Sequence, residues 1–297
     1  MKTGSNSILI LLLFLTMIIW GATWTSAKLI TYMAAPEVII FWRFFFTFLS
    51  MIPVLLFLRR SIRINRKSLF LIILGSIFIV SYNKCFFLGL RYGYANVGGV
   101  LVTTMNPILI YLFSIIIFWN HISRMALIGL VMGFLGGAVL LEAWSINFER
   151  LVSSGNAYFL LASTSWALLT LTSEKCKGST SPLIFSFYVF GLAALIDFVL
   201  ALPLGIWDVF NEGWLFWSNL LFLSVGATTI ATTIYFAASS RLGSQRAGSF
   251  IFLVPTSAVL ISWIVLDERI KMTTIIGGIL ALIAVYLINI PKYSKNE

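Results

Sequence analysis

The chain has 297 residues, of which 60% are hydrophobic and 10% charged, and basic side chains outnumber acidic ones 20 to 10. Its mean hydropathy is +1.01. So few polar side chains cannot cover a water-soluble globule, and the composition therefore indicates an integral membrane protein. The net charge of +10 does not indicate nucleic-acid binding, because no basic helix or stripe lies in a soluble segment.

Apolar runs of about 20 residues, each long enough to cross ~30 Å of hydrocarbon, follow one another along the chain. We predict ten membrane-spanning helices, at about residues 8–28, 36–58, 68–90, 95–119, 124–143, 154–174, 182–204, 214–238, 243–266 and 272–290. The first run has no cleavage site of the signal-peptide kind, so we expect it to stay in the protein. The links between the runs are short, and any binding must therefore take place within the helix bundle.

An internal repeat is visible in the rare residues. Six of the seven prolines form three pairs, 146, 150 and 148 residues apart: Pro36 with Pro182, Pro53 with Pro203, and Pro107 with Pro255. Trp20 and Trp166 are also 146 residues apart. Five predicted helices fall in each half, and because five is odd, the second half must enter the membrane from the opposite side. We predict an all-α integral membrane protein of ten helices in two inverted five-helix repeats, residues 1–143 and 154–290, with a short cytoplasmic tail, 291–297.

The basic residues predict the orientation in the membrane. The link after the second predicted helix is rich in them, whereas its counterpart after the seventh, 205–214, holds only Asp208 and Glu212. With the N-terminus inside, 13 Lys and Arg side chains are cytoplasmic and five are outside, namely Lys28, Arg91, Arg150, Arg269 and Lys271. The positive-inside rule then places both termini in the cytoplasm, and we expect a multi-pass protein of the cytoplasmic (inner) membrane.

Three charged side chains lie well within the predicted spans: Arg43, Lys84 and Asp197. A charge in lipid is costly, so a functional role is the first hypothesis for each. None has a charged counterpart at the repeat spacing, and an unpaired cation in a cavity would suit the carboxylate of an amino acid or organic acid. The alternative is structural, either snorkelling to the outer headgroups or an ion pair of Asp197 with one of the two cations.

Aromatic side chains are the next candidates for substrate contact. Trp20 and Trp24 form a stripe on the first predicted helix, and Trp166 lies at the matching place on the sixth. Together with Tyr82 they would form a stacking wall for a planar or apolar substrate. The alternative is a belt of aromatic residues at the membrane interface.

Polar groups and prolines occur together near the middle of the predicted helices. Thr103, Asn106 and Thr232 add hydroxyl and amide groups, although such residues more often hold helices together. Pro107 and Pro255 each remove the hydrogen bond to the carbonyl four residues earlier, which leaves a free acceptor at membrane depth. We interpret the two prolines as hinges because they repeat, with a plain packing kink as the alternative.

No motif of an enzyme or a metal site is present. The one histidine, His121, lies in a predicted link, and the chain has no zinc-protease, serine-hydrolase or P-loop motif. We therefore expect no catalytic residue, no metal and no cofactor. Gly129, Gly133 and Gly137 form two overlapping GxxxG steps on the fifth predicted helix, which permit close packing within the chain or in a homodimer through this helix or the tenth.

Several short motifs together resemble the EamA-type branch of the drug/metabolite transporter superfamily over essentially the whole chain. They are Trp20-Gly21, Arg43 within Phe41–Phe44, Leu88–Tyr92 through Ala95, Pro107 and Pro255, Leu266–Glu268, and Gly129 and Gly277. The resemblance implies a ten-helix exporter or importer of small metabolites, with helices 1–4 and 6–9 lining the cavity and helices 5 and 10 outside them. One departure is Asn120, which stands where the second repeat has Glu268.

The residues and the resemblance together predict a secondary transporter that works by alternating access within the lipid bilayer. Its small-molecule substrates are expected to be carboxylate-bearing metabolites, amino acids foremost, and the expected direction is export. Two alternatives stay open. One is an exporter of drugs or quaternary cations, for which Asp197 is the only deep carboxylate, and the other is a membrane scaffold that transports nothing.

Overall fold

A computed structural model describes residues 3–59, 62–93, 95–119, 122–140, 142–145, 154–258, 261 and 272–290. Within these ranges the chain is built of helices, and no strand is found. The residue pair Asn120 and Glu268, the Leu266–Glu268 motif and the tail 291–297 lie outside the described residues.

The first half of the chain contains α1 (Thr3–Ile30), α2 (Pro36–Phe57), α3 (Arg66–Tyr92), α4 (Ala95–Phe118), α5 (Arg124–Leu140) and the short η1 (Ala143–Ser145). The second half contains α7 (Ser154–Lys175), α8 (Pro182–Ala201), η2 (Leu202–Leu204), η3 (Asp208–Asn211), α9 (Trp214–Leu221), η4 (Phe222–Thr232), α10 (Thr233–Leu242), α11 (Ser244–Ser249), η5 (Phe250–Leu253) and α13 (Met272–Asn289). The elements α9, η4 and α10 form one continuous helix, whose middle part, η4, is a π-helix of 11 residues.

Seven helices of the described chain are long and apolar enough to cross a membrane: Ser7–Ile30, Pro36–Phe57, Arg66–Tyr92, Gly98–Phe118, Pro182–Leu204, Trp214–Leu242 and Met272–Asn289. The helix Arg124–Leu140 is apolar but shorter. The prediction of an all-α membrane protein is confirmed. The number of ten membrane crossings stays a prediction.

Local sequence explains where the helices begin. Pro36 and Pro182, the first of the repeated proline pairs, each occupy the first turn of a helix, α2 and α8. Proline suits this position because its missing N–H would have no partner there. The side chain of Asn65 accepts a hydrogen bond of 2.8 Å from the backbone N–H of Ser68 and so caps α3. Pro36 and Pro182 therefore mark equivalent helix starts in the two halves.

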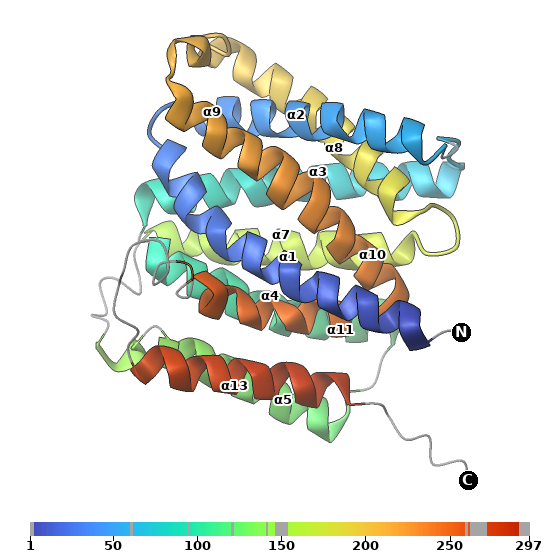
Figure 1. The fold of residues 1–297 in the computed structure, drawn as a ribbon, viewed down its shortest axis with the longest axis vertical. Coiled ribbons are helices and arrows are strands. Elements are labelled where there is room, and N and C mark those ends of the chain that lie inside the picture. The colour runs from blue at the N-terminus through green and yellow to red at the C-terminus, as the bar shows by residue number, and fades with distance from the viewer. Residues whose placement is uncertain are drawn as a thin grey trace.

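The helices pair across the two halves of the chain. α3 packs along α7, α2 along α8, and α1 against η4, while α4 contacts α7, α11 and η5. Figure 1 shows α5 and α13 side by side at one edge of the bundle, with α2 and α8 toward the opposite edge. The remaining helices lie between these two pairs, and the candidate site is found among them.

Glycines allow α5 and α13 to approach each other closely. A Cβ atom on Gly136 would lie 3.1 Å from the carbonyl oxygen of Gly277, and one on Gly129 would lie 3.0 Å from that of Ala284. Gly133 faces the ring of Phe252 in η5, and Gly137 faces Thr104 in α4. The glycines of α5 are thus used for packing within the chain.

We predict that Gly277→Val destabilises the protein. A Cβ atom at this position would lie 2.9 Å from the carbonyl oxygen of Gly136, so α5 and α13 must separate, and overpacking of this kind costs about 1–3 kcal/mol. The measurement is thermal unfolding of the purified protein in detergent. The neighbouring Ile276→Val, at a side chain that is 47% exposed, serves as the control and should leave the melting temperature unchanged. Equal melting temperatures for both variants would contradict the close packing.

Candidate functional site

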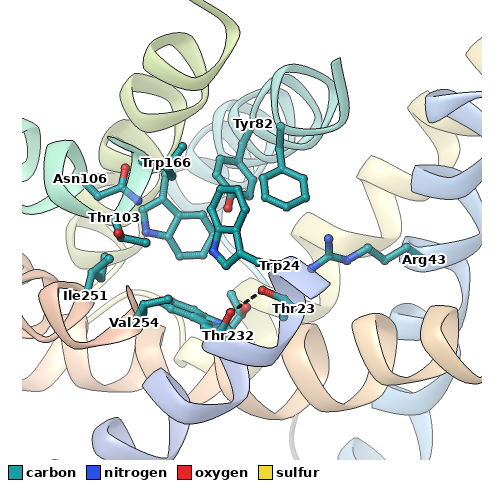
Figure 2. A pocket seen from close by; sticks show the side chains of 13 residues that line it. Thr23, Trp24, Arg43, Tyr82, Thr103, Asn106, Trp166, Thr232, Ile251 and Val254 are labelled. Carbon is teal, nitrogen blue, oxygen red and sulfur yellow. Dashed lines mark hydrogen bonds between the residues drawn. The ribbon is translucent and has the colours of Figure 1, made fainter. Parts of the chain in front are cut away.

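A cavity with about 530 Å³ of empty space, including the part open to solvent, lies between helices of both halves. Figure 2 shows the side chains that surround it, and the lining residues are Trp20, Thr23, Trp24, Arg43, Tyr82, Phe86, Val102, Thr103, Asn106, Trp166, Thr232, Ile251 and Val254. They come from α1, α2, α3, α4, α7, η4 and η5, and from the residue that follows η5.

Most of the residues proposed from the sequence as substrate contacts meet at this cavity. The ones that line it are Trp20, Trp24, Arg43, Tyr82, Thr103, Asn106, Trp166 and Thr232. Lys84 and Asp197 do not line it. The expected hinge residues, Pro107 and Pro255, each follow directly on a lining residue, Asn106 and Val254.

Sequence reasoning missed five lining residues: Thr23, Phe86, Val102, Ile251 and Val254. Two simple signals would have found most of them. Phe86 lies one helical turn after Tyr82, on the same face of α3. Ile251 and Val254 lie 148 residues after Thr103 and Asn106, at the spacing of the matched prolines.

Arg43 brings a positive charge to the cavity wall. Its Nη1 donates a hydrogen bond of 2.9 Å to Oδ1 of Asn83 in α3, while Nε and Nη2 donate to Oγ1 of Thr228 in η4 at 3.1 and 3.0 Å. Both partners are neutral, and Arg43 forms no ion pair with any described residue. The guanidinium has five N–H donors in a planar fork, so it can still bind a carboxylate.

The partners of Arg43 are themselves fixed by the backbone. Asn83 donates from Nδ2 to the carbonyl of Ile79 at 3.0 Å, which turns its Oδ1 toward the guanidinium. Thr228 donates to the carbonyl of Leu223 at 2.7 Å, five residues earlier in the π-helix, and therefore offers its lone pairs to Arg43. The guanidinium is thus held in one orientation by two helices.

Aromatic rings form a continuous group beside Arg43. Trp20 and Trp166 meet edge to face with ring centres 5.1 Å apart, and Tyr82 lies 4.9 Å from Trp166. Trp24 packs against Phe86 at 4.8 Å. Indole Nε1 of Trp20 donates to the carbonyl of Ala227 in η4 at 3.2 Å, which fixes the ring against the π-helix. The group offers ring faces and edges against which an apolar or planar ligand can pack.

The opposite wall of the cavity is polar on α4. Asn106 is buried, and its Oδ1 atom has no hydrogen-bond partner among the described residues. Thr103 bonds its own helix, donating to the carbonyl of Gly99 at 2.7 Å. In Figure 2, Asn106 and Arg43 lie on opposite sides of the aromatic group formed by Trp24, Trp166 and Tyr82. The cavity therefore offers a free acceptor at one end and a cation at the other.

The two proline positions differ in their local structure. α4 continues through Pro107, whereas Pro255 follows η5, where the helix tightens to 3₁₀ geometry over Phe250–Leu253. Each proline removes the donor four residues on from a carbonyl of a lining residue, Thr103 or Ile251. The carbonyl of Ile251 accepts a bond from the backbone N–H of Val254 instead, so the free acceptor expected there is not found. The backbone is thus irregular where it adjoins the cavity, the kind of place where a bundle tolerates it.

Lys84 and Asp197 belong to a second group of charges, outside the cavity lining. Nζ of Lys84 lies 3.3 Å from Oε1 of Glu37 in the first turn of α2. The side chains of Lys84 and Glu37 are 43% and 18% exposed, whereas Asp197 is 1% exposed. Asp197 interacts electrostatically with both. Glu37 directly follows the helix-starting Pro36 and was not among the residues expected to be functional.

The described residues contain no cluster of three or more His, Cys, Asp or Glu side chains that could hold a metal ion. None of the residues lining the cavity is a carboxylate, a histidine or a cysteine. This arrangement is suited to binding and provides no general base or nucleophile of the usual kind within the lining.

Comparison with known families gives a match over nearly the whole chain. The model of the EamA-like transporter family matches it twice, at residues 7–141 and 153–290.

Individual relatives are distant in sequence but similar in length. The chain is 24% identical over 296 residues to the uncharacterized transporter YyaM of Bacillus subtilis (strain 168), covering 93% of each protein. It is 23% identical over 286 residues to a probable amino-acid metabolite efflux pump of Salmonella typhimurium (strain LT2), again covering 93% of each. A solved crystal structure has the same fold, with a TM-score of 0.76 at 18% identity over 95% of this chain and 96% of that one.

We predict that Thr228→Val destabilises the protein while Thr233→Val does not. The first change removes the oxygen that accepts two bonds from Arg43, and losing a hydrogen bond to a charged group costs about 1.5–3 kcal/mol. The second removes a buried hydroxyl that has no partner among the described residues, so it is the matched control. Thermal unfolding in detergent measures both. If the two variants melt at the same temperature, Thr228 does not hold the guanidinium.

Proposed function

Because the chain belongs to the EamA-like transporter family, we propose that it exports small carboxylate-bearing metabolites, amino acids foremost, across the cytoplasmic membrane. The family and the apolar helices make it a multi-pass membrane transporter of small molecules, not an enzyme. To this transporter role we add the substrate class, the direction of transport and the alternating-access mechanism.

The observation that carries the substrate class is Arg43. It presents a guanidinium to the cavity, its partners Asn83 and Thr228 are neutral, and it has no ion pair among the described residues. An uncompensated charge inside a membrane bundle is costly, and an anionic substrate removes that cost when it binds. A carboxylate matches the guanidinium in shape, since the two can form parallel hydrogen bonds.

The remainder of the cavity favours a zwitterion over a simple acid. The Oδ1 atom of Asn106 is a buried acceptor with no partner among the described residues, and it can receive a bond from a substrate ammonium group. Between Asn106 and Arg43 the rings of Trp24, Trp166 and Tyr82 can cover an apolar substrate side chain. The name of the Salmonella relative, an amino-acid metabolite efflux pump, supports the same substrate class.

For the mechanism we propose ten membrane crossings in two inverted repeats, 1–143 and 154–290, that rock about the cavity. Three observations support this. The family model matches each half separately. Figure 1 shows α1 and α7 running in opposite directions across the bundle. Equivalent helices also pack on the opposite half of the chain. α1 of the first half packs on η4 of the second, and its counterpart α7 packs on α3 of the first.

The orientation that we propose has both termini in the cytoplasm. In Figure 1 the start of α1, the end of α13 and the basic link between α2 and α3 all lie at one end of the bundle. The link between α8 and α9, which contains Asp208 and Glu212, lies at the other end. This separation of charge agrees with the positive-inside rule.

The alternatives have less support. A cation exporter needs a carboxylate in the cavity, and no described lining residue is one, since Asp197 lies outside it. A scaffold would not need a cation at a cavity wall. A homodimer through α5 or α13 would have to use outward side chains such as Phe134 and Tyr286, because the glycines of α5 face the chain itself.

We predict that Arg43→Gln weakens substrate binding. Cells that overproduce the protein should resist toxic amino-acid analogues, and the variant should lose that resistance. In membrane vesicles its affinity for labelled amino acids should fall roughly tenfold or more, because a charge-assisted contact contributes about 1.5–3 kcal/mol. The matched control, Arg66→Gln, removes an exposed arginine from the first turn of α3 and should transport normally. Resistance to quaternary cations that survives Arg43→Gln would favour the cation exporter instead.

We predict that alanine in place of Pro107 or Pro255 slows transport. Pro255→Ala provides a backbone N–H that can replace that of Val254 at the carbonyl of Ile251 and turn η5 into regular α-helix, so the protein should stay folded while turnover slows several-fold. Pro107→Ala should act in the same way on the carbonyl of Thr103. Pro53→Ala, inside α2 and away from the cavity lining, is the control. Initial transport rates and melting temperatures are measured together, and unchanged rates for the first two variants would reduce both prolines to packing elements.

A further inference from the structure

A group of three charged side chains lies beside the transport cavity and has no part in it. Asp197 is in the last turns of α8, Glu37 in the first turn of α2, and Lys84 in the later part of α3. Nζ of Lys84 lies 3.3 Å from Oε1 of Glu37, and Asp197 interacts electrostatically with both. We refer to these three side chains as the charge triad.

Asp197 is the buried member of the triad. It is 1% exposed, and its Oδ2 atom has no hydrogen-bond partner among the described residues. An ionised carboxylate in such a place lacks both water and a bond to that oxygen, which is costly. A proton on the carboxyl group removes the charge.

The charges of the triad do not balance without a proton. One lysine can compensate one carboxylate, and the triad has two, so it is neutral only when it has bound one proton. The side chains of Lys84 and Glu37 are 43% and 18% exposed, so two members of the triad are in contact with solvent.

Few other charges face Asp197. The elements packed against α8 are α2, α3, α10 and η2. α2 contributes Glu37, and its Arg43 bonds Asn83 and Thr228. α3 contributes Lys84, while η2 has the sequence Leu-Pro-Leu and no titratable group. α10 carries Tyr235, whose hydroxyl pairs with Thr170 at 3.2 Å, and Arg241 in its last turn, at the other end of the bundle. Among the described residues, the charges that act on Asp197 are therefore those of Glu37 and Lys84.

The triad is connected to the cavity through two helices. Lys84 directly follows Asn83, which accepts a hydrogen bond from Arg43 at 2.9 Å. Glu37 and Arg43 both belong to α2, about 9 Å apart along the helix at 1.5 Å per residue. A change in the charge of the triad therefore acts on α2, which carries Arg43, and on α3, which holds its guanidinium through Asn83.

We propose that Asp197, Glu37 and Lys84 form a proton-binding site that couples export to the transmembrane proton gradient. The coupling rests on the proposed function, whereas the proton site itself does not. A proton from water forms an O–H bond with a carboxylate oxygen of Asp197 while Lys84 stays paired with Glu37, and breaking the same O–H bond returns the proton to water. If one proton is exchanged for each substrate molecule, a gradient of one pH unit can bias the distribution of substrate across the membrane tenfold.

The first experiment detects the proton directly and needs no substrate. Infrared difference spectra of the full-length protein in lipid vesicles are recorded while the pH is varied. The wild type should show the C=O band of a protonated carboxyl group, and Asp197→Asn should lack it. Asp208→Asn makes the same chemical change at an exposed carboxylate and should retain the band. A band that persists in Asp197→Asn overturns the proton site.

The second experiment tests coupling in the same vesicles with an isotopically labelled mixture of the standard amino acids. In the wild type an imposed gradient of one pH unit should change net transport by up to tenfold. Asp197→Asn should lose this response and retain exchange at equal pH. Stimulation that survives in the variant overturns the coupling. Absence of any exchange in the wild type contradicts the amino-acid function instead, and leaves the infrared result standing.

Glu37→Gln keeps the proposal testable if Asp197→Asn fails to fold. Glu37 is at the start of α2 and partly exposed, so the change is mild. Lys84 then balances Asp197 without a proton, and the carboxyl band and the response to the pH gradient should both weaken. A full response in a folded Glu37→Gln protein would contradict the charge balance on which the site depends.

Discussion

A guanidinium inside a membrane bundle must have partners, and the way Arg43 is held determines much of the geometry around it. Arg43 comes from α2, Asn83 from α3 and Thr228 from η4, so one charged group joins three helices taken from both halves of the chain. Since both partners are neutral, no described residue compensates the positive charge at the cavity wall by an ion pair. The same interaction therefore joins the helices and leaves a cation at the cavity wall, on which the proposed affinity for an anionic substrate rests.

The π-helix η4 provides what this arrangement needs. Its hydroxyls bond carbonyls five residues earlier, as Thr228 does to Leu223 at 2.7 Å and Thr232 does to Ala227 at 2.9 Å. Thr228 is thereby oriented toward Arg43, and the carbonyl of Ala227 also receives the indole N–H of Trp20. Segments with this geometry are rare and frequently occur at functional sites. In an ordinary α-helix the hydroxyl of Thr228 and the carbonyl of Ala227 would point in other directions.

The sequence predicts what depends on local composition, and it fails where helices must be placed relative to one another. Apolar runs and the proline at a helix start, as at Pro36, are local properties, and the helices follow them closely. The pairing of Lys84 with Glu37 depends on the depth and rotation of α2 against α3, which no local pattern records. For the same reason GxxxG steps indicated close packing of α5 without revealing that its partner is α13.

Repetition and asymmetry have different roles in this cavity. Trp20 and Trp166, matched across the halves, meet edge to face at 5.1 Å and form a shared scaffold. Asn106 has Val254 at its matching position, and Arg43 has no charged counterpart, so the polar contacts of the lining are concentrated in the first half. In our proposal the halves rock about the cavity. A substrate held by the first half would then keep its polar contacts in both access states while the apolar wall of the second half moves past it, which leaves its affinity similar on the two sides of the membrane.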